Sequence, residues 1–355
     1  MMMVFEKSSE ATIHLLNTPN AHELYLGKSG SGKTWAICRR VEELYSFGKK
    51  ILILDYSGSY TVEELEKSGL STEYLHVIDL ISQKVAFPIM DGSNTDADRI
   101  VSLGDNVLGI NGPLQKKILS DVAAEVCKGT NASFGEIQRV LEKRRENAMN
   151  NEDHEYADRV EKVMDRWQLL AEQEKINIWN TDGVVPDSHK IVILQMSKLP
   201  ANQRKIYMNT VLWGLWQLLV RRESGFDIAV IDEAQHINFN AEIPSQIMRE
   251  GRKWGIGLLL STQFLAGLDK ESVSTILQAA NTFYFQPDTS NIKWTASQIE
   301  PERPYEWLPI LRNLEVGEAV LCGEYTINQN RNPVKKPKPI IVKIKRRYKN
   351  ARYIY

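Results

Sequence analysis

The sequence predicts an α/β fold with a mostly parallel central sheet and a helical insertion. Short apolar runs alternate with helical or polar segments, a rhythm typical of strands connected by covering helices. A glycine-rich stretch joins the first apolar run to a helix. Residues 112–176 instead are polar, highly charged and helical in pattern. We therefore expect one α/β domain over residues 1–330, with the insertion at about 112–176, followed by a basic tail at 331–355.

The N-terminal elements follow one another as strand, loop, helix and strand. Residues 22–26 (HELYL) form a short β-rich run before the glycines. The next segment has apolar residues at helical spacing and Gly48 just past its end as a stop signal, the apolar positions being Ile37, Val41, Leu44 and Tyr45. Residues 51–54 (ILIL) are continuously apolar, as expected for a buried parallel strand.

The insertion carries one apolar stripe, which we interpret as ordinary packing of one helix face. Its members are Val160, Val163, Met164, Trp167 and Leu170. After residue 190 the α/β rhythm returns. The predicted strands there are 191–194, 228–231, 257–260, 282–285 and 319–321.

The composition argues against a disulfide-stabilised protein, a CxxC metal protein and a membrane protein. The three cysteines, Cys38, Cys127 and Cys322, are widely spaced, so they indicate neither a disulfide framework nor a CxxC metal site. No apolar stretch is long enough for a membrane span, and the N-terminus lacks a signal-peptide pattern. We expect a cytoplasmic protein without a membrane segment.

The net charge of −1 conceals a segregation of charge. Residues 331–355 contain ten Lys or Arg and no acid, so the rest of the chain carries −11. The tail fits three roles: binding of phosphates, an edge strand with outward lysines in PIIVKIKRRY, or an arm lying on an acidic neighbouring subunit.

The strongest motif is Gly27–Thr34, GKSGSGKT, which fits the phosphate-binding pattern GxxxxGK[ST]. Its glycines let backbone N–H groups face the phosphates, and the helix that follows adds its positive dipole end. Lys33 contacts the β- and γ-phosphates, and the Thr34 hydroxyl binds Mg²⁺. A chance glycine turn is the alternative, but the motif lies between a predicted strand and a predicted helix, as required. The predicted nucleotide-binding residues are Gly27, Ser29, Gly30, Ser31, Gly32, Lys33, Thr34 and Trp35.

The second motif is a buried strand that ends in two acids, DIAVIDEAQH over residues 227–236. Adjacent buried carboxylates are unfavourable unless a cation or a proton-accepting role compensates. We predict that Asp232 holds Mg²⁺ through a water and that Glu233 is the general base. The alternative is an Asp-Glu pair that caps a helix. His236 fits local packing as well as a sensor role.

The third motif, residues 249–263, is a basic turn that enters an apolar strand ending in Thr262 and Gln263. A polar amide at the carboxyl end of a central strand lies where a γ-phosphate is expected. Gln263 is therefore a candidate sensor or water-positioning residue. From these residues alone, Arg252 fits equally an arginine finger that reaches a neighbouring subunit and a solvated turn.

Other nucleotide-binding classes fit less well. The chain has no NKxD-type or LSGGQ-type motif, and only 92 residues follow Gln263, too few for a second ATPase-like lobe. A motor built from one such core requires oligomerisation, with sites at subunit interfaces.

Four segments together resemble the HerA–FtsK superfamily of hexameric DNA-pumping ATPases, most closely its HerA branch. They are HELYLGKSGSGKT, ILILDYSGSY, AVIDEAQH and REGRKWGIGLLLSTQ, and NLEVGEAVLCG resembles the closing strand of the family. The resemblance covers about 22–60 and 190–323. It implies a RecA-like (ASCE) fold with ATP and Mg²⁺, Lys33 and Thr34 on phosphate and metal, Asp232 and Glu233 as metal-associated acid and catalytic base, Gln263 as sensor, and Arg252 as the trans-acting finger.

Two features depart from that family. Only about 21 residues precede the first predicted strand, so we expect the usual N-terminal β-barrel to be missing. The loop after the second strand has Ser59 where relatives usually have an acid, which leaves the role of Asp55 and its loop open.

The sequence thus predicts an ATP-hydrolysing ring motor, a homo-oligomer expected to be hexameric, that translocates double-stranded DNA. We expect a separately encoded nuclease or effector partner, in DNA processing, transfer or antiphage defence. Candidate DNA contacts are Lys198, Arg204 and Lys205, which equally fit a solvated helix start. The alternatives are a nucleotide-gated ring scaffold that regulates a partner enzyme without translocation, and a viral genome-packaging ATPase.

Overall fold

A computed structural model describes residues 13–15, 21–129, 131–172, 175–179, 183–184, 190–223, 225–265, 267–327 and 338–344. Within these residues the chain forms a nine-stranded sheet in the order β13-β11-β10-β2-β9-β8-β3-β7-β4. The strands from β10 to β4 pair in parallel, and β11 and β13 add an antiparallel edge. The bounds are β2 Glu23–Leu26, β3 Ile51–Asp55, β4 Leu75–Asp79, β7 Ile191–Gln195, β8 Ile228–Ile231, β9 Gly257–Thr262, β10 Asn281–Phe285, β11 Glu318–Cys322 and β13 Ile340–Lys343. The predicted strands and the α/β class are confirmed.

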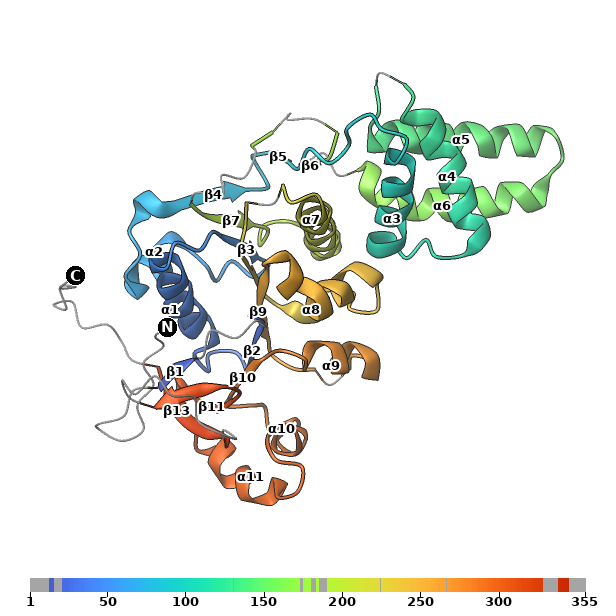
Figure 1. Cartoon of the computed structure of the whole chain (residues 1–355). Helices are drawn as coiled ribbons and strands as arrows, with labels where there is room; N and C mark the ends of the chain where they lie inside the picture. Colours follow the sequence, from blue (N-terminus) through green and yellow to red (C-terminus); the bar gives the residue numbers. More distant parts are fainter. Residues whose placement is uncertain are drawn as a thin grey trace.

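Helices cover both faces of this sheet (Figure 1). One face carries α1 (Lys33–Ser46) and α2 (Val62–Ser68). The other carries α7 (Ala201–Val220), α8 (Glu242–Trp254), α9 (Lys270–Ile276), α10 (Ile292–Ile299) and α11 (Pro304–Arg312). Short 3₁₀ turns lie at Thr72–Tyr74 and at Ala234–His236. The layered arrangement places every central strand between two apolar surfaces.

Alternate side chains of each central strand enter different cores. Ile51 and Ile53 join the cluster under α1 and α2, whereas Leu52 and Leu54 join the larger cluster on the opposite face. All four are fully buried. Because successive strand residues point to opposite faces, a continuous apolar run is the pattern that a strand covered on both sides requires.

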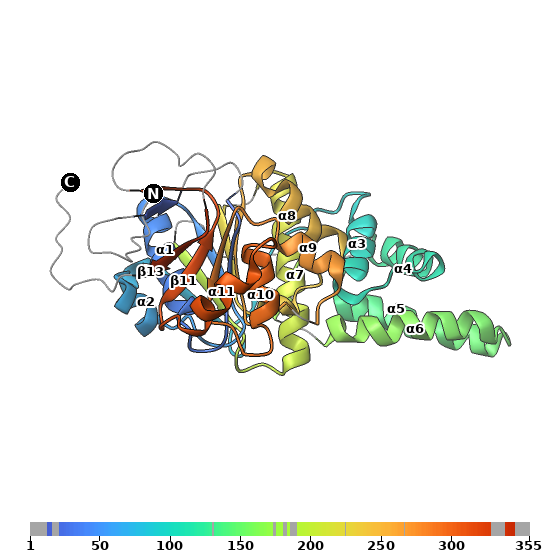
Figure 2. The same cartoon turned by 90° about the horizontal axis from the view of Figure 1, so that it is seen from below.

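A helical unit beside the sheet is made of α3 (Asp96–Leu108), α4 (Pro113–Val126), α5 (Phe134–Asn150) and α6 (His154–Ala171). Helices α4 to α6 lie within the insertion predicted at about 112–176, and α3 precedes it. Helices α5 and α6 project away from the sheet as a hairpin (Figure 2). The stripe on α6 is packed as expected: Trp167 is fully buried, and its Nε1 donates to the Phe134 carbonyl at 3.0 Å. Exposed ion pairs such as Lys162–Asp158 cover the outer surface.

Two-stranded pairs lie outside the nine-stranded sheet. Strands β5 (Val85–Ala86) and β6 (Ile176–Asn177) pair in parallel where the chain leaves for the helical unit and returns from it. Strand β1 (Ile13–Leu15) pairs with β12 (Tyr325–Ile327). In the basic tail, β13 is an edge strand whose exposed Lys343 lies 2.6 Å from Glu315. The other positively charged residues predicted for the tail, apart from Lys338, lie outside the described residues.

No helix within the described ranges is both long enough and apolar enough to cross a bilayer.

Candidate active site

The glycine-rich loop lies at the carboxyl edge of the sheet, between the ends of β9 and β10. The Gly27 N–H donates to the Thr262 carbonyl at 3.3 Å, and the Lys28 N–H donates to the Gln286 carbonyl at 2.9 Å. Gly32 has φ +106°, and a Cβ there would lie 2.7 Å from the Gly317 nitrogen. A side chain at this position is therefore excluded by both backbone conformation and space. Helix α1 begins at the next residue, so its N-terminus faces the loop.

Lys33 crosses the loop from the first turn of α1. Its Nζ donates to the carbonyls of Gly27 at 2.6 Å and Lys28 at 3.0 Å. Burial lowers the pKa of Lys33, while the charges of nearby acids, Glu233 foremost, oppose that shift. Within the described residues the buried Ser31 Oγ has no hydrogen-bond partner. A cation, an unsatisfied hydroxyl and a helix N-terminus thus converge on one point, which fits the phosphates of a nucleotide.

Asp232 and Glu233 follow β8 at the same edge of the sheet. Asp232 is buried, and its Oδ2 accepts from the Ser57 N–H at 3.1 Å and from the Ser57 hydroxyl. Burial raises the pKa of Asp232 to about 6, the charges of Asp55 and Glu233 add to the shift, and the hydrogen bonds from Ser57 oppose it. A cation at this carboxylate would relieve that cost.

The residues fit Mg²⁺ as well as phosphate. The described part of the chain holds no group of three or more His, Cys, Asp or Glu side chains placed for a metal. Mg²⁺ commonly keeps several waters and takes one or two protein ligands beside substrate phosphates. The Thr34 hydroxyl is a suitable direct ligand of this kind, and the Asp232 carboxylate is suited to hold one of the waters on the ion.

The loop after β3 is organised by Asp55. This side chain is fully buried, and its Oδ1 accepts from the N–H groups of Gly58 at 2.9 Å and Ser59 at 3.0 Å. The Ser59 hydroxyl lies 2.7 Å from the Ser57 hydroxyl. In this chain Ser59 therefore supports Ser57, which in turn contacts Asp232.

Glu233 has a left-handed backbone, with φ 53° and ψ 54°, which is uncommon outside glycine. Its Oε1 accepts from Gln263 Nε2 at 2.9 Å, and its Oε2 accepts from Gln235 Nε2 at 2.6 Å. The structure thus brings Gln263 to Glu233, at the edge where Lys33 and Asp232 also lie. Gln235 and Ser57 were missed as functional candidates, although both lie within motifs that the sequence singles out.

His236 packs against Tyr56. Its ring lies 4.4 Å from the Tyr56 ring, centroid to centroid, and the Arg204 guanidinium lies over the other ring at 5.0 Å. Burial lowers the pKa of His236, with Lys205 and Arg204 adding to the effect. The contacts favour the packing role over the sensor role.

The basic segment at the start of α7 is largely engaged in internal contacts. Lys198 Nζ lies 2.7 Å from Asp79 Oδ2, and Arg204 Nε donates to the Leu199 carbonyl at 2.7 Å. Lys205 is exposed. These contacts favour the helix-start interpretation for Lys198 and Arg204.

Arg252 lies at the opposite edge of the sheet, where the strands begin. Strand β9 starts at Gly257, just after α8, and its six residues span about 20 Å before reaching Gln263. Arg252 is exposed and lines a cavity of about 190 Å³ together with His22, Met248, Arg249 and Gln278. Among the described residues it forms no ion pair, whereas Lys253 pairs with Glu250 at 3.2 Å. Arg252 therefore does not join the phosphate loop of its own chain.

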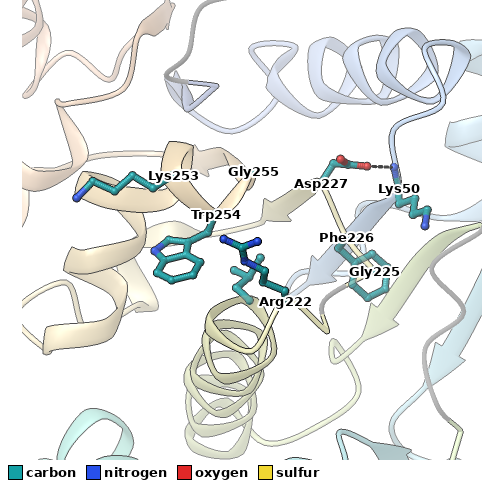
Figure 3. Close-up of a pocket in the computed structure, with 9 residues that line it drawn as sticks. Lys50, Arg222, Gly225, Phe226, Asp227, Lys253, Trp254 and Gly255 are labelled. Carbon is teal, nitrogen blue, oxygen red and sulfur yellow. Dashed lines mark hydrogen bonds between the residues drawn. The ribbon is translucent and has the colours of Figure 1, made fainter.

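A second cavity, of about 350 Å³, lies at this same amino edge (Figure 3). It is bounded by the end of α7 and the starts of β3, β8 and β9. The Arg222 guanidinium points toward Trp254, whereas the Lys253 side chain points away from it (Figure 3). The phosphate loop is not part of either cavity.

Comparisons with known proteins agree with this geometry. Residues 3–213 match the family described as Helicase HerA, central domain. The chain belongs to this HerA family. The DNA double-strand break repair helicase HerA of Sulfolobus acidocaldarius is 24% identical over 329 residues, and that of Sulfurisphaera tokodaii is 22% identical over 340. Each alignment covers 87% of this chain and 63% of the relative, so the chain spans somewhat less than two thirds of those proteins.

Solved structures show the same fold at low identity. VirB4 of Thermoanaerobacter pseudethanolicus superposes with a TM-score of 0.65 at 15% identity, covering 92% of this chain and 89% of that one. The plasmid coupling protein TrwB in complex with ADP and Mg²⁺ superposes with a TM-score of 0.64 at 14% identity, covering 93% and 86%. The HerA-family chain thus has a RecA-like P-loop fold.

Proposed function

We propose that this HerA-family chain is an ATPase that forms a ring and translocates double-stranded DNA. The observation that carries the proposal is the division of the chemical groups between two edges of one sheet. The carboxyl edge holds Lys33, Asp232 and Glu233, and the amino edge exposes Arg252. A subunit arranged in this way completes a site only when the amino edge of a neighbour faces its phosphate loop.

In the proposed site the chain's own residues bind and orient ATP. Lys33 leaves the two loop carbonyls and contacts the β- and γ-phosphates, and the loop N–H groups and the Ser31 hydroxyl donate to phosphate oxygens. Thr34 would hold Mg²⁺ directly and Asp232 would hold it through a water, and the bound ion would neutralise charge on the phosphates. Trp35 follows Thr34 in the first turn of α1; its side chain packs against the core under that helix, and its backbone N–H is the group available to phosphate.

Glu233 acts as the general base. It accepts a proton from the attacking water as the water oxygen bonds to the γ-phosphorus and the bond to the β–γ bridging oxygen breaks. Each carboxylate oxygen has two lone-pair sites, so the bonds from Gln235 and Gln263 leave room for that water. Arg252 of the adjacent subunit stabilises charge on the transferring phosphoryl group.

Translocation requires contacts with the DNA backbone. The HerA relatives are named as helicases of DNA double-strand break repair, which supports duplex DNA as the substrate track. We expect phosphate contacts that position without reading bases. Lys205 is the exposed member of the basic segment and the candidate contact from α7. A separately encoded nuclease or effector remains the predicted partner.

The experiment is the ATPase rate of the full chain with and without linear duplex DNA, with sedimentation velocity to measure assembly. We expect ATP-dependent oligomers and a rate that rises several-fold with DNA and falls as salt is raised. Lys33→Ala is the matched control and should be inactive in both conditions. A rate indifferent to DNA would contradict the motor and favour the nucleotide-gated scaffold.

A further inference from the structure

Two amide side chains hold the Glu233 carboxylate, one on each oxygen. Gln263 Nε2 lies 2.9 Å from Oε1, and Gln235 Nε2 lies 2.6 Å from Oε2. Gln263 follows β9, whereas Gln235 lies two residues after Glu233 in the 3₁₀ turn Ala234–His236. The plane of the carboxylate is therefore fixed from two directions.

The orientation of the Gln235 amide follows from its contact with the Glu233 carboxylate. An ionised carboxylate only accepts, so the Gln235 group that faces Glu233 is the N–H₂ group. Its Oε1 consequently faces Thr262, whose hydroxyl lies 2.6 Å away and must donate. The opposite amide orientation would place two acceptors together at Glu233. The Thr262 hydroxyl, which also lies 3.1 Å from the Phe264 carbonyl, holds the amide in the orientation that the Glu233 carboxylate requires.

Both connections to Glu233 start from consecutive residues at the end of β9. Gln263 contacts the carboxylate directly, and the fully buried Thr262 contacts it through Gln235. The left-handed backbone of Glu233 places its carboxylate within this network at a conformational cost. Such a cost persists only where surrounding contacts hold the residue in place.

We propose that Gln235 is a positioning residue for ATP hydrolysis, held by Thr262 and itself holding Glu233 at the angle required to accept a proton. Gln235 does not touch ATP or the attacking water. This inference rests on the proposed role of Glu233 as the base. In this role of Gln235, the end of β9 supports both Gln263, the γ-phosphate sensor, and Glu233, the base.

The test uses variants that change the two contacts of the Gln235 amide one at a time: the donor that faces Glu233, and the acceptor that faces Thr262. Gln235→Glu keeps an acceptor for Thr262 and replaces the donor with a second carboxylate. Thr262→Val removes only the hydroxyl, and Thr262→Ser retains it. Gln168→Glu is the matched control, because Gln168 Nε2 makes the same kind of bond to Glu172 at 2.8 Å on the exposed surface of α6.

We expect Gln235→Glu and Thr262→Val to lower kcat by about 10- to 100-fold, as for a small misplacement of a catalytic group. KM and the affinity for a non-hydrolysable ATP analogue should stay within about twofold, since binding depends on the phosphate loop. Thr262→Ser and Gln168→Glu should retain at least half of the wild-type kcat. A purely structural role would lower thermal stability and raise KM together with the loss of kcat.

A double variant completes the design. Gln235→Glu should have no further effect on kcat in a Glu233→Gln background, because the base that it positions is already absent. If Glu233→Gln is inactive but Gln235→Glu and Thr262→Val keep wild-type kcat, the positioning role is wrong and the base assignment stands. If Glu233→Gln itself retains wild-type kcat, the base assignment fails, and the inference fails with it.

Discussion

The two edges of the central sheet differ in the burial of their charged side chains. At the carboxyl edge, polar side chains from several loops converge and are buried against one another, as with Asp55, Asp232 and Lys33. At the amino edge, Arg249 and Arg252 are exposed near the end of α8 and line a cavity. Under the proposed function each edge is half of a site, and the halves come from different subunits.

Buried polar groups also exist at the amino edge, but there they join elements. Glu23 at the start of β2 pairs with Arg40 of α1 at 2.7 Å, and Arg40 pairs with Glu43 at 2.8 Å. The His22 Nδ1 accepts from the Leu258 N–H at 3.0 Å. These contacts join α1 and β9 to β2 and the residue before it, so the amino edge is a support with exposed arginines at its surface.

The largest expected effect is the loss of the Arg40 network. Arg40→Leu leaves Glu23 and Glu43 buried without their cation, so we expect the free energy of unfolding to fall by about 3–5 kcal/mol. Urea denaturation measures it. Arg159→Leu, which breaks the more exposed pair with Glu155 on α6, should cost less than about 1 kcal/mol. Equal losses in the two variants would show that the buried network is not a support.

The next effect tests the carboxyl edge. Glu233→Gln keeps the size of the side chain and removes the proton acceptor, so kcat should fall by about 10³-fold while ATP still binds. Single-turnover hydrolysis and filter binding of an ATP analogue measure the two quantities. Glu242→Gln, an exposed acid at the start of α8, is the control and should be neutral.

A smaller effect concerns His22 and pH. Burial lowers the pKa of His22 to about 4 from 6.5, so folded His22 is neutral where the unfolded side chain begins to protonate. Its contribution to stability is therefore fully present above pH 6.5 and is lost as pH falls through about 4. The stability of wild type relative to His22→Asn should fall by about 3 kcal/mol over that interval. A stability difference between wild type and His22→Asn that does not change with pH would contradict the lowered pKa of His22. His154→Asn, at an exposed position, is the control.

The smallest expected effect is that of Lys253→Gln at the amino edge. Lys253 is exposed and paired with Glu250, so Lys253→Gln should change stability by less than about 0.5 kcal/mol. Its ATPase rate should stay within about twofold of wild type.

Arg252→Gln should instead abolish most of the activity of the assembled protein. Similar rates for the two variants would leave Arg252 as an ordinary surface residue.

The sequence predicted the elements whose signal is local. The loop at Gly27–Thr34, the strand that ends in Asp232 and the strand that ends before Gln263 each follow from spacing and apolar pattern, and the structure contains all three elements. Gln235 and Ser57 could not be assigned in this way. Their roles depend on contacts to Thr262 and Asp232, 27 and 175 residues away, which only the order of the strands brings together.

The most direct test of the central claim is complementation between the two edges. Lys33→Ala subunits lack a working phosphate loop but carry Arg252, and Arg252→Ala subunits have the reverse defect. Each variant alone should be inactive, and a mixture allowed to assemble with duplex DNA should regain ATPase activity, because some interfaces then combine an intact loop with an intact arginine. A mixture that stays inactive, although both variants co-assemble by sedimentation, would contradict the shared site.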